Sequence, residues 1–273
     1  MGLDEDNLQA EWMRRPKIKV FGERNTGTRA VTRMLRAFEG VSINLPDPTM
    51  PDIDFLRARI ETSFKGFQRR LYRNALDDLR GSRLEGVSAW KHAAPTIDES
   101  YHENLVSVLF MVRDPYSWIG SLFRHPYHIR GPRLDTLEGF IQQPWLTMQR
   151  DNVDPVLHSP MMLWNEKLRA YLAFMDAAIV PTTVLKFEDF VLDPVFALSA
   201  SLARFGVSGE GLEEVEEPTK VKGVDRKNRI EYYQSAAWKK AISPETANLI
   251  NGFVDWDVAA RFGYKLRAPS EFA

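Results

Sequence analysis

The chain alternates short apolar runs with longer segments in which apolar residues recur at helical spacing. Ile18 and Val20 alternate with lysines, which predicts a short strand. Residues 105–112 form a nearly continuous apolar run, as is typical of a parallel strand covered on both faces. The other strands that the pattern predicts lie at 41–45, 86–91 and 182–187.

Helices are predicted between these strands. Val31, Met34 and Leu35 fall at helical spacing, and so do Trp164 and Leu168 further along the chain. Strands that alternate with helices predict an α/β fold of three layers, with a central, mainly parallel sheet flanked by helices. In such a sheet, ligands bind at the carboxyl ends of the strands. Further helices are expected within 52–83 and 243–263, after Pro115 and after Asp193-Pro194.

Composition favours a single domain over residues 1–273, with a basic helical insert at about 52–83 and an irregular excursion at about 124–160. The formal net charge of −1 gives no global case for nucleic acid. No apolar run approaches the roughly 18 residues that cross a bilayer, so we expect no membrane partner. The lack of cysteine excludes disulfides, thiolate metal sites and cysteine nucleophiles, and fits a cytoplasmic location.

The turn between the first strand and the first helix carries the clearest chemistry. Gly22 and Gly27 bracket it, and basic residues are dense on both sides. A strand, a glycine-bearing turn and a helix start together aim backbone N–H groups and a positive dipole end at an anion. The spacing is half of a nucleotide-triphosphatase loop but lacks the lysine after its second glycine. The alternative is an ordinary turn with a solvated basic helix face.

Two further strand ends carry polar groups. Lys91 and His92 follow the strand predicted at 86–91, and Arg113 follows the apolar run, with Ser121 eight residues later. A parallel sheet can bring all three strand ends to one edge.

In the order and spacing of its motifs, the chain resembles the sulfotransferases that use 3′-phosphoadenosine-5′-phosphosulfate. The loop Arg24-Asn-Thr-Gly-Thr-Arg29 is similar to their first loop, and Val112-Arg-Asp-Pro115 with Ser121 is similar to their second signature. Leu185-Lys-Phe-Glu-Asp-Phe190 resembles a later segment of the family. The C-terminal features that are similar to the family are Arg226-Lys227, Trp238 and Gly263-Tyr264. The resemblance spans roughly residues 17 to 264 and implies a P-loop-like fold.

The resemblance also implies roles. The backbone amides of Thr26 to Arg29, with the Thr28 hydroxyl, would hold the 5′-phosphosulfate, and Arg113 with Ser121 would bind the 3′-phosphate. Phe187 would stack on the adenine. The alternatives are a structural salt bridge for Arg113, a buried helix serine and a solvated C-terminal loop. The residues expected to bind the donor are Arg24, Asn25, Thr26, Gly27, Thr28, Arg29, Arg113, Ser121, Phe187, Arg226 and Lys227.

Sulfuryl transfer needs a base for the acceptor proton and positive charge at the leaving phosphate. His92 is the first candidate base, although it stands one position away from the histidine of the family's Lys-x-His-x-Pro pattern. Glu23 is the competing base. Arg24 is assigned to the bridging oxygen and the leaving phosphate, with Lys91 as a helper, because Asn25 occupies the position where the family has a basic residue.

The sequence therefore predicts transfer of a sulfuryl group from 3′-phosphoadenosine-5′-phosphosulfate to a hydroxyl or amine of a small-molecule or carbohydrate acceptor. The co-product is 3′,5′-adenosine bisphosphate. No metal is required, because Arg and Lys side chains balance the negative charge. The alternatives are a P-loop kinase that uses ATP and a nucleotide-binding module without catalytic activity. The sequence predicts neither the acceptor nor the oligomeric state.

Overall fold

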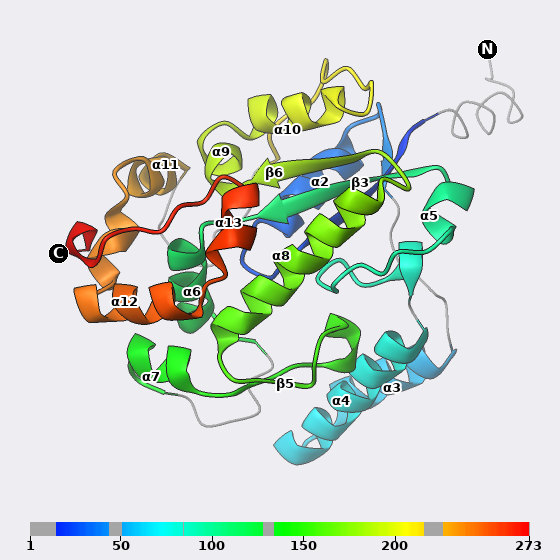
Figure 1. The fold of residues 1–273 in the computed structure, drawn as a ribbon. Coiled ribbons are helices and arrows are strands. Elements are labelled where there is room, and N and C mark those ends of the chain that lie inside the picture. The colour runs from blue at the N-terminus through cyan, green and yellow to red at the C-terminus, as the bar shows by residue number, and fades with distance from the viewer. Residues whose placement is uncertain (1–14, 44–50, 84, 128–133, 216–225, 273) are drawn as a thin grey trace, which may run out of the picture.

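A computed structural model describes residues 15–43, 51–83, 85–127, 134–215 and 226–272. Its centre is a four-stranded sheet in the order β2–β1–β3–β6, and all neighbouring strands are parallel (Figure 1). The strands are β1 (Lys17–Gly22), β2 (Ser42–Ile43), β3 (Val106–Val112) and β6 (Thr182–Lys186). The predicted strands at 18–20, 105–112 and 182–187 are thereby confirmed. The strand expected at 41–45 is seen at Ser42–Ile43, and residues 44–45 lie outside the described residues.

Helices cover both faces of the sheet, which makes the expected three layers. One face packs Ile18, Val20 and Leu109 against helices α2 and α10. The other packs Phe21 and Phe110 into a larger cluster with α6 and α8. The helices that flank the sheet or follow its strands are α2 (Thr28–Ala37), α6 (Pro115–Arg124), α8 (Pro160–Ala177), α9 (Phe187–Leu192), α10 (Pro194–Ala203), α12 (Pro244–Phe253) and α13 (Trp256–Arg261).

The strand order puts a topological switch point at the carboxyl end of β1. The chain leaves β1 for β2 on one side and later returns to β3 on the other, so β1 and β3 bound a topological switch point. Gly22 lies opposite Met111, and Val112 lies opposite Lys186. The segments that follow these three strands are therefore neighbours at one edge of the sheet.

The strand predicted at 86–91 is wrong, because residues Gly86–Ser88 form a short 3₁₀ helix, η1. Side chains occupy the backbone groups that a sheet would use: Gly86 N–H donates to Thr96 Oγ1 at 3.2 Å and Val87 N–H to Ser100 Oγ at 2.9 Å. Gly86 also has φ of +54°, outside the range of a strand. Apolar alternation alone does not register such competition from polar side chains.

The basic insert is a helical hairpin of α3 (Pro51–Thr62) and α4 (Gly66–Arg83), which projects from the rest of the molecule (Figure 1). The excursion at 124–160 contains a small antiparallel pair of strands that flank a short 3₁₀ helix. No helix within the described residues is long and apolar enough to cross a membrane. The remaining elements are α5 (Ser100–Glu103), α7 (Leu137–Gln142), β4 (Trp145–Leu146), η2 (Gln149–Asp151), β5 (Val156–Leu157), α11 (Arg226–Gln234), η3 (Ala237–Ala241) and η4 (Pro269–Glu271).

Candidate functional site

The loop between β1 and α2 is a tight turn with two left-handed residues. Asn25 has φ of +65° and Gly27 has φ of +87°. Between them, the buried Thr26 donates its hydroxyl to the carbonyl of Glu23 at 2.5 Å, and its N–H donates to the same oxygen at 3.3 Å. Gly27 is the N-cap of α2 and supplies no side chain to cap the helix.

The first amides of α2 are left for a ligand. Among the described residues, the N–H groups of Gly27 and Thr28 and the hydroxyl of Thr28 have no hydrogen-bond partner. These donors stand at the positive end of the helix dipole. A loop of this form at the carboxyl end of a parallel strand is suited to hold a phosphate or sulfate group.

Lys91 and His92 reach this loop although no strand carries them. Gly22 N–H donates to the carbonyl of Lys91 at 2.9 Å, and His92 Nδ1 lies 2.5 Å from the carbonyl oxygen of Gly22. The half-buried imidazole also meets the edge of Trp90, with ring centres 4.7 Å apart. Burial, with a smaller contribution from the Lys91 charge, holds the pKa of His92 well below its ordinary value.

Arg113 joins three segments of the site. Nε and Nη2 donate to the hydroxyl and carbonyl of Ser117 at 2.9 and 3.0 Å, Nη1 donates to the carbonyl of Asn25 at 2.6 Å, and Nη2 donates to the Tyr233 hydroxyl at 2.9 Å. The guanidinium also lies over the Phe187 ring, 4.2 Å from its centre. Only one of its N–H groups remains for a ligand. Through its bond to Asn25, Arg113 therefore also holds the loop between β1 and α2 in place.

Phe187 and Ser121 are two further residues that were predicted to bind the donor. A Cβ built on Gly27 would lie 3.2 Å from the Phe187 ring, and Tyr233 meets the same ring edge-on at 5.1 Å. Ser121 follows Ser117 by one turn of α6, and its hydroxyl has no partner among the described residues. The structure thus brings together the predicted residues Gly27, Arg113 and Phe187, with Ser121 one helical turn further on.

The side chains at the start of α11 are less closely associated with the loop. Arg226 is exposed and forms an ion pair with Glu214 at 2.7 Å. Lys227 and Arg29 are also exposed. Tyr233, on the last turn of α11, is the residue that reaches Arg113 and Phe187. Sequence reasoning missed it because the basic pair at the start of the helix carried the stronger signal.

Arg24 is held between two aromatic rings. Its guanidinium lies 3.8 Å from the centre of the Tyr127 ring and 4.6 Å from that of Trp90. Trp90 also lies under the guanidinium of Arg150, at 3.8 Å. The Trp90 ring is half-buried and is in contact with both guanidinium groups. Such stacking fixes the direction of a guanidinium without using its N–H groups.

Glu23 is buried at the base of the loop. Its Oε1 accepts hydrogen bonds from the Arg24 N–H at 2.6 Å and from the hydroxyl of Tyr127, while its Oε2 has no hydrogen-bond partner among the described residues. Burial raises the pKa of Glu23, and the nearby Lys167 partly opposes this rise. Lys167 is also fully buried, donates to the backbone carbonyl of Asp151, and has its pKa lowered by burial.

A signal for Lys167 was present in the sequence. It lies three residues after Trp164 and four before Tyr171, which places it within the apolar stripe of α8. A lysine in such a stripe is buried or reaches past it to a polar partner. Lys19 is a comparable case: it alternates with Ile18 and Val20 in β1, yet it is 1% exposed and donates to the carbonyls of Val87 and Ala89.

Three of the motifs behind the family resemblance interlock as a frame. Glu188 accepts from the Asp114 N–H at 2.9 Å and from the Tyr264 hydroxyl at 3.0 Å. Asp114 caps α6 by accepting from the N–H groups of Tyr116 and Ser117. The Arg-Asp-Pro, Phe-Glu-Asp and Gly-Tyr segments thus hold the end of β3 in place.

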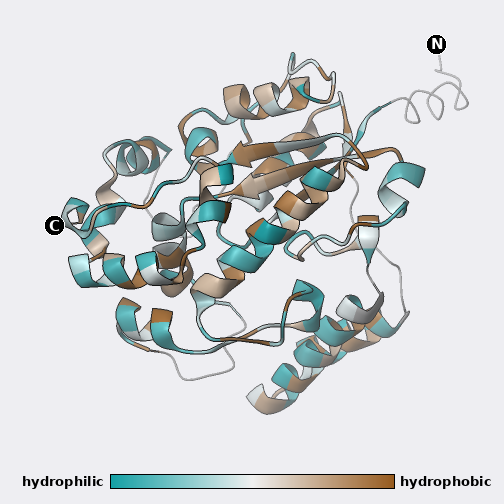
Figure 2. Cartoon of the chain, viewed as in Figure 1, coloured by the Kyte–Doolittle hydropathy of each residue, from teal (hydrophilic) through white to brown (hydrophobic). Residues whose placement is uncertain are grey.

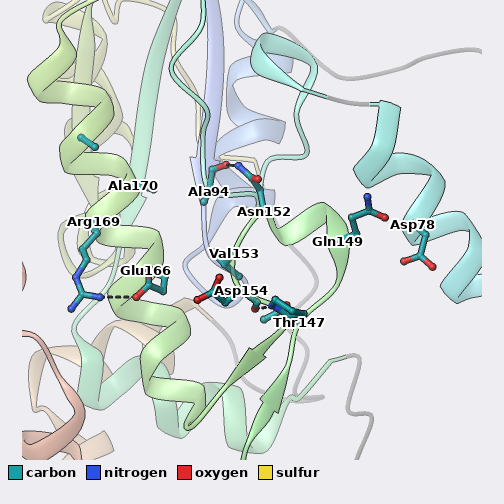
Figure 3. A pocket seen from close by; sticks show the side chains of 12 residues that line it. Asp78, Ala94, Thr147, Gln149, Asn152, Val153, Asp154, Glu166, Arg169 and Ala170 are labelled. Atoms are coloured by element: carbon teal, nitrogen blue, oxygen red, sulfur yellow. Dashed lines mark hydrogen bonds and ion pairs between the residues drawn. The ribbon is translucent and has the colours of Figure 1, made fainter.

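A separate cavity of about 800 Å³ lies between α8, α4 and the turn that follows η2 (Figure 3). Its charged lining residues are Asp78, Asp154, Glu166 and Arg169, and Arg169 pairs with Glu166 at 2.6 Å. None of the predicted site residues lines it. Among the described residues, no group of His, Asp and Glu gathers as metal ligands do.

No family model and no curated protein matches the chain. Among solved structures, it is similar to the crystal structure of a sulfotransferase from Alicyclobacillus acidocaldarius, with 16% sequence identity and a TM-score of 0.46. The match covers 92% of this chain and 97% of that chain.

Proposed function

We propose that the protein is a sulfotransferase that uses 3′-phosphoadenosine-5′-phosphosulfate as donor and a hydroxyl or amine as acceptor. The observation that carries the proposal is the start of α2. There the amides of Gly27 and Thr28 and the Thr28 hydroxyl form one set of donors without partners among the described residues. Such a set favours the sulfated 5′ end of the nucleotide. No lysine follows Gly27, and a donor without a γ-phosphate does not need one.

The 3′-phosphate would lie toward α6. The Ser121 hydroxyl and the remaining N–H of Arg113 are the donors available there. Binding of the 3′-phosphate by two N–H groups of Arg113 would require a rearrangement, because four hydrogen bonds to the protein already hold its guanidinium. Its main contribution in this arrangement is to fix the carbonyl of Asn25 and thereby the loop. Phe187 would offer its ring to the adenine, and Arg226 would have to leave Glu214 to reach a phosphate.

The reaction would begin with the acceptor atom in line with the bond between sulfur and the bridging phosphate oxygen. As the acceptor bonds to sulfur, that bond breaks and its electron pair leaves with 3′,5′-adenosine bisphosphate. Arg24, oriented between Trp90 and Tyr127, would stabilise the charge on the leaving phosphate. Lys91, beside Gly22, would assist it.

The proton of the acceptor would pass to Nε2 of His92. Because the Gly22 carbonyl only accepts, Nδ1 of the neutral imidazole must be the donor, and Nε2 keeps the lone pair. Glu23 remains the competing base. Its burial and its hydrogen bonds to Tyr127 and the Arg24 N–H favour a role in holding the loop.

The test is donor turnover. The protein is incubated with 3′-phosphoadenosine-5′-phosphosulfate and pools of sugars, phenols and amines, and mass spectrometry follows both sulfated product and adenosine bisphosphate. A sulfated acceptor formed together with adenosine bisphosphate is the expected result. If the same pools are phosphorylated from ATP and Mg²⁺, the kinase alternative is correct. Binding of adenosine bisphosphate without turnover in any pool would favour the nucleotide-binding module.

A further inference from the structure

The hairpin of α3 and α4 exposes aromatic side chains at its far end. Phe64, in the turn between the helices, is 101% exposed, and Phe67, in the first turn of α4, is 75% exposed. Leu71 lies four residues later on the same helix face and is 54% exposed. Figure 2 shows hydrophobic ribbon at this projecting end. Large apolar groups clustered in water mark a surface that meets another phase or another molecule.

The same end is strongly basic. Residues 63–76 contain no Asp or Glu. They contain Lys65, Arg69, Arg70 and Arg73, all exposed. In a chain with a net charge of −1, this is a local excess of positive charge. We call residues 63–73 the hairpin tip.

We propose that the hairpin tip docks the protein on an anionic membrane surface. Phe64 and Phe67 would enter the boundary between head groups and acyl chains, and the cations around them would meet lipid phosphates and carboxylates. Each cation close to such a surface adds to the attraction between the protein and anionic lipid. The absence of a long apolar run, which led us to expect no membrane partner, concerns segments that span a bilayer and does not test for tips of this kind.

The shape of the tip favours lipid over protein as the occupant. Two protruding aromatic rings on a projecting turn would require a partner protein with matching deep pockets and an acidic rim. An anionic bilayer offers an apolar interior below a negative surface, which matches exposed aromatic rings with exposed cations close by in the same hairpin. The inference does not depend on the proposed reaction.

Helix α4 connects the hairpin tip to residues beside the candidate site. From Phe67 to Asp77, α4 rises by about 15 Å. Asp77 forms a buried ion pair with Arg150 at 2.8 Å, and Arg150 lies over Trp90, which also contacts Arg24. A docked tip would therefore hold the site near the membrane surface.

The test uses the full chain and sedimentation with vesicles. One set contains phosphatidylcholine alone, and in the other about a third of the lipid is phosphatidylserine. We expect at least tenfold stronger binding to the second set, lost as salt is raised. Phe64→Ser with Phe67→Ser should weaken that binding at least tenfold. The matched control is Phe196→Ser, because Phe196 is 73% exposed on α10, outside the hairpin, and its loss should leave binding unchanged.

A charge series completes the experiment. Lys65→Glu with Arg70→Glu should abolish the preference for phosphatidylserine, whereas Arg204→Glu, at an exposed cation beyond α10, should not. Unchanged thermal melting shows that each variant is folded. The proposal is overturned if wild-type protein ignores phosphatidylserine or if the double Phe variant binds as well as wild type. It is also overturned if the tip variants abolish a concentration-dependent dimer instead, since the tip would then meet a second copy.

Discussion

The imidazole of His92 and the carbonyl of Gly22 form a hydrogen bond of 2.5 Å where β1 ends and the loop to α2 begins. Because the carbonyl can only accept, the bond fixes the tautomer and leaves Nε2 as the proton acceptor of the ring. Burial keeps the pKa of His92 well below its ordinary value, so the ring is neutral at pH 7. His92 therefore contacts the start of the loop, although it stands one position away from the histidine of the family pattern.

His92→Ala should lower kcat by about 10²- to 10⁴-fold, the usual loss when a general base is removed. In the wild type, kcat should stay level from pH 8 down to about 6.5 and fall only at lower pH, because the base is neutral throughout that range. Initial rates of sulfation across this range measure both effects. His102→Ala, at an exposed position on α5, is the control. If His92→Ala retains full activity and Glu23→Gln loses it, the base is Glu23.

Tyr127→Phe should lower the free energy of unfolding by about 1–3 kcal/mol, because it removes a hydrogen bond from the buried carboxylate of Glu23. Urea unfolding followed by fluorescence measures the change. Tyr232→Phe is the control, since the Tyr232 hydroxyl has no hydrogen-bond partner among the described residues. Equal stability of the two variants would show that the Tyr127 hydroxyl does not support Glu23.

The parallel sheet and the turn from β1 to α2 could be predicted from the sequence because each depends on local pattern. The apolar run at 105–112 and the glycines that flank the loop have few structural alternatives. The 3₁₀ helix at Gly86–Ser88 was missed because Thr96 and Ser100, ten or more residues away, occupy its amides. Competition of that kind is set by tertiary structure and leaves no periodic signal.

Gly27→Ala should weaken binding of the nucleotide and lower stability by about 1–2 kcal/mol, because an L-residue at φ of +87° is strained. Its Cβ would also lie 3.2 Å from the Phe187 ring. Calorimetric titration with adenosine bisphosphate and thermal melting measure the two effects. Gly252→Ala, in α12 with nothing within 4 Å of the added Cβ, should be neutral or slightly stabilising. Unchanged binding by Gly27→Ala would argue against the loop as the ligand site.

Lys19 should make stability rise with pH. Burial lowers its pKa to about 7 in the folded protein, from 10.5 ordinarily. Between these values the unfolded chain binds more protons, so the free energy of unfolding increases with pH, by up to about 1.4 kcal/mol per unit. Urea unfolding of wild type and Lys19→Met at several pH values should therefore give diverging curves. The exposed Lys17→Met variant should run parallel to wild type. Parallel curves for Lys19→Met would contradict the shift.

The sequence analysis did not predict that Lys167 and Glu23 are both buried beside the site. Lys167 and Glu23 come from a helix and a loop more than 100 residues apart, and their burial follows from how α8 crosses the sheet. Tyr127 and Trp90, which contact Arg24, also come from separate segments of the chain. Motif order could identify Arg24, but its aromatic neighbours come from segments that no motif connects.

In the proposed function, the loop after β1 and the end of β3 hold a nucleotide with 5′ and 3′ groups and no γ-phosphate. Thermal melting of the wild type with 3′,5′-adenosine bisphosphate, compared with ATP and Mg²⁺, tests it most directly, because a ligand that binds only the folded state raises the melting temperature. The account predicts a rise with adenosine bisphosphate that Gly27→Ala reduces, and no rise with ATP and Mg²⁺. Stabilisation by ATP and Mg²⁺ alone would contradict it.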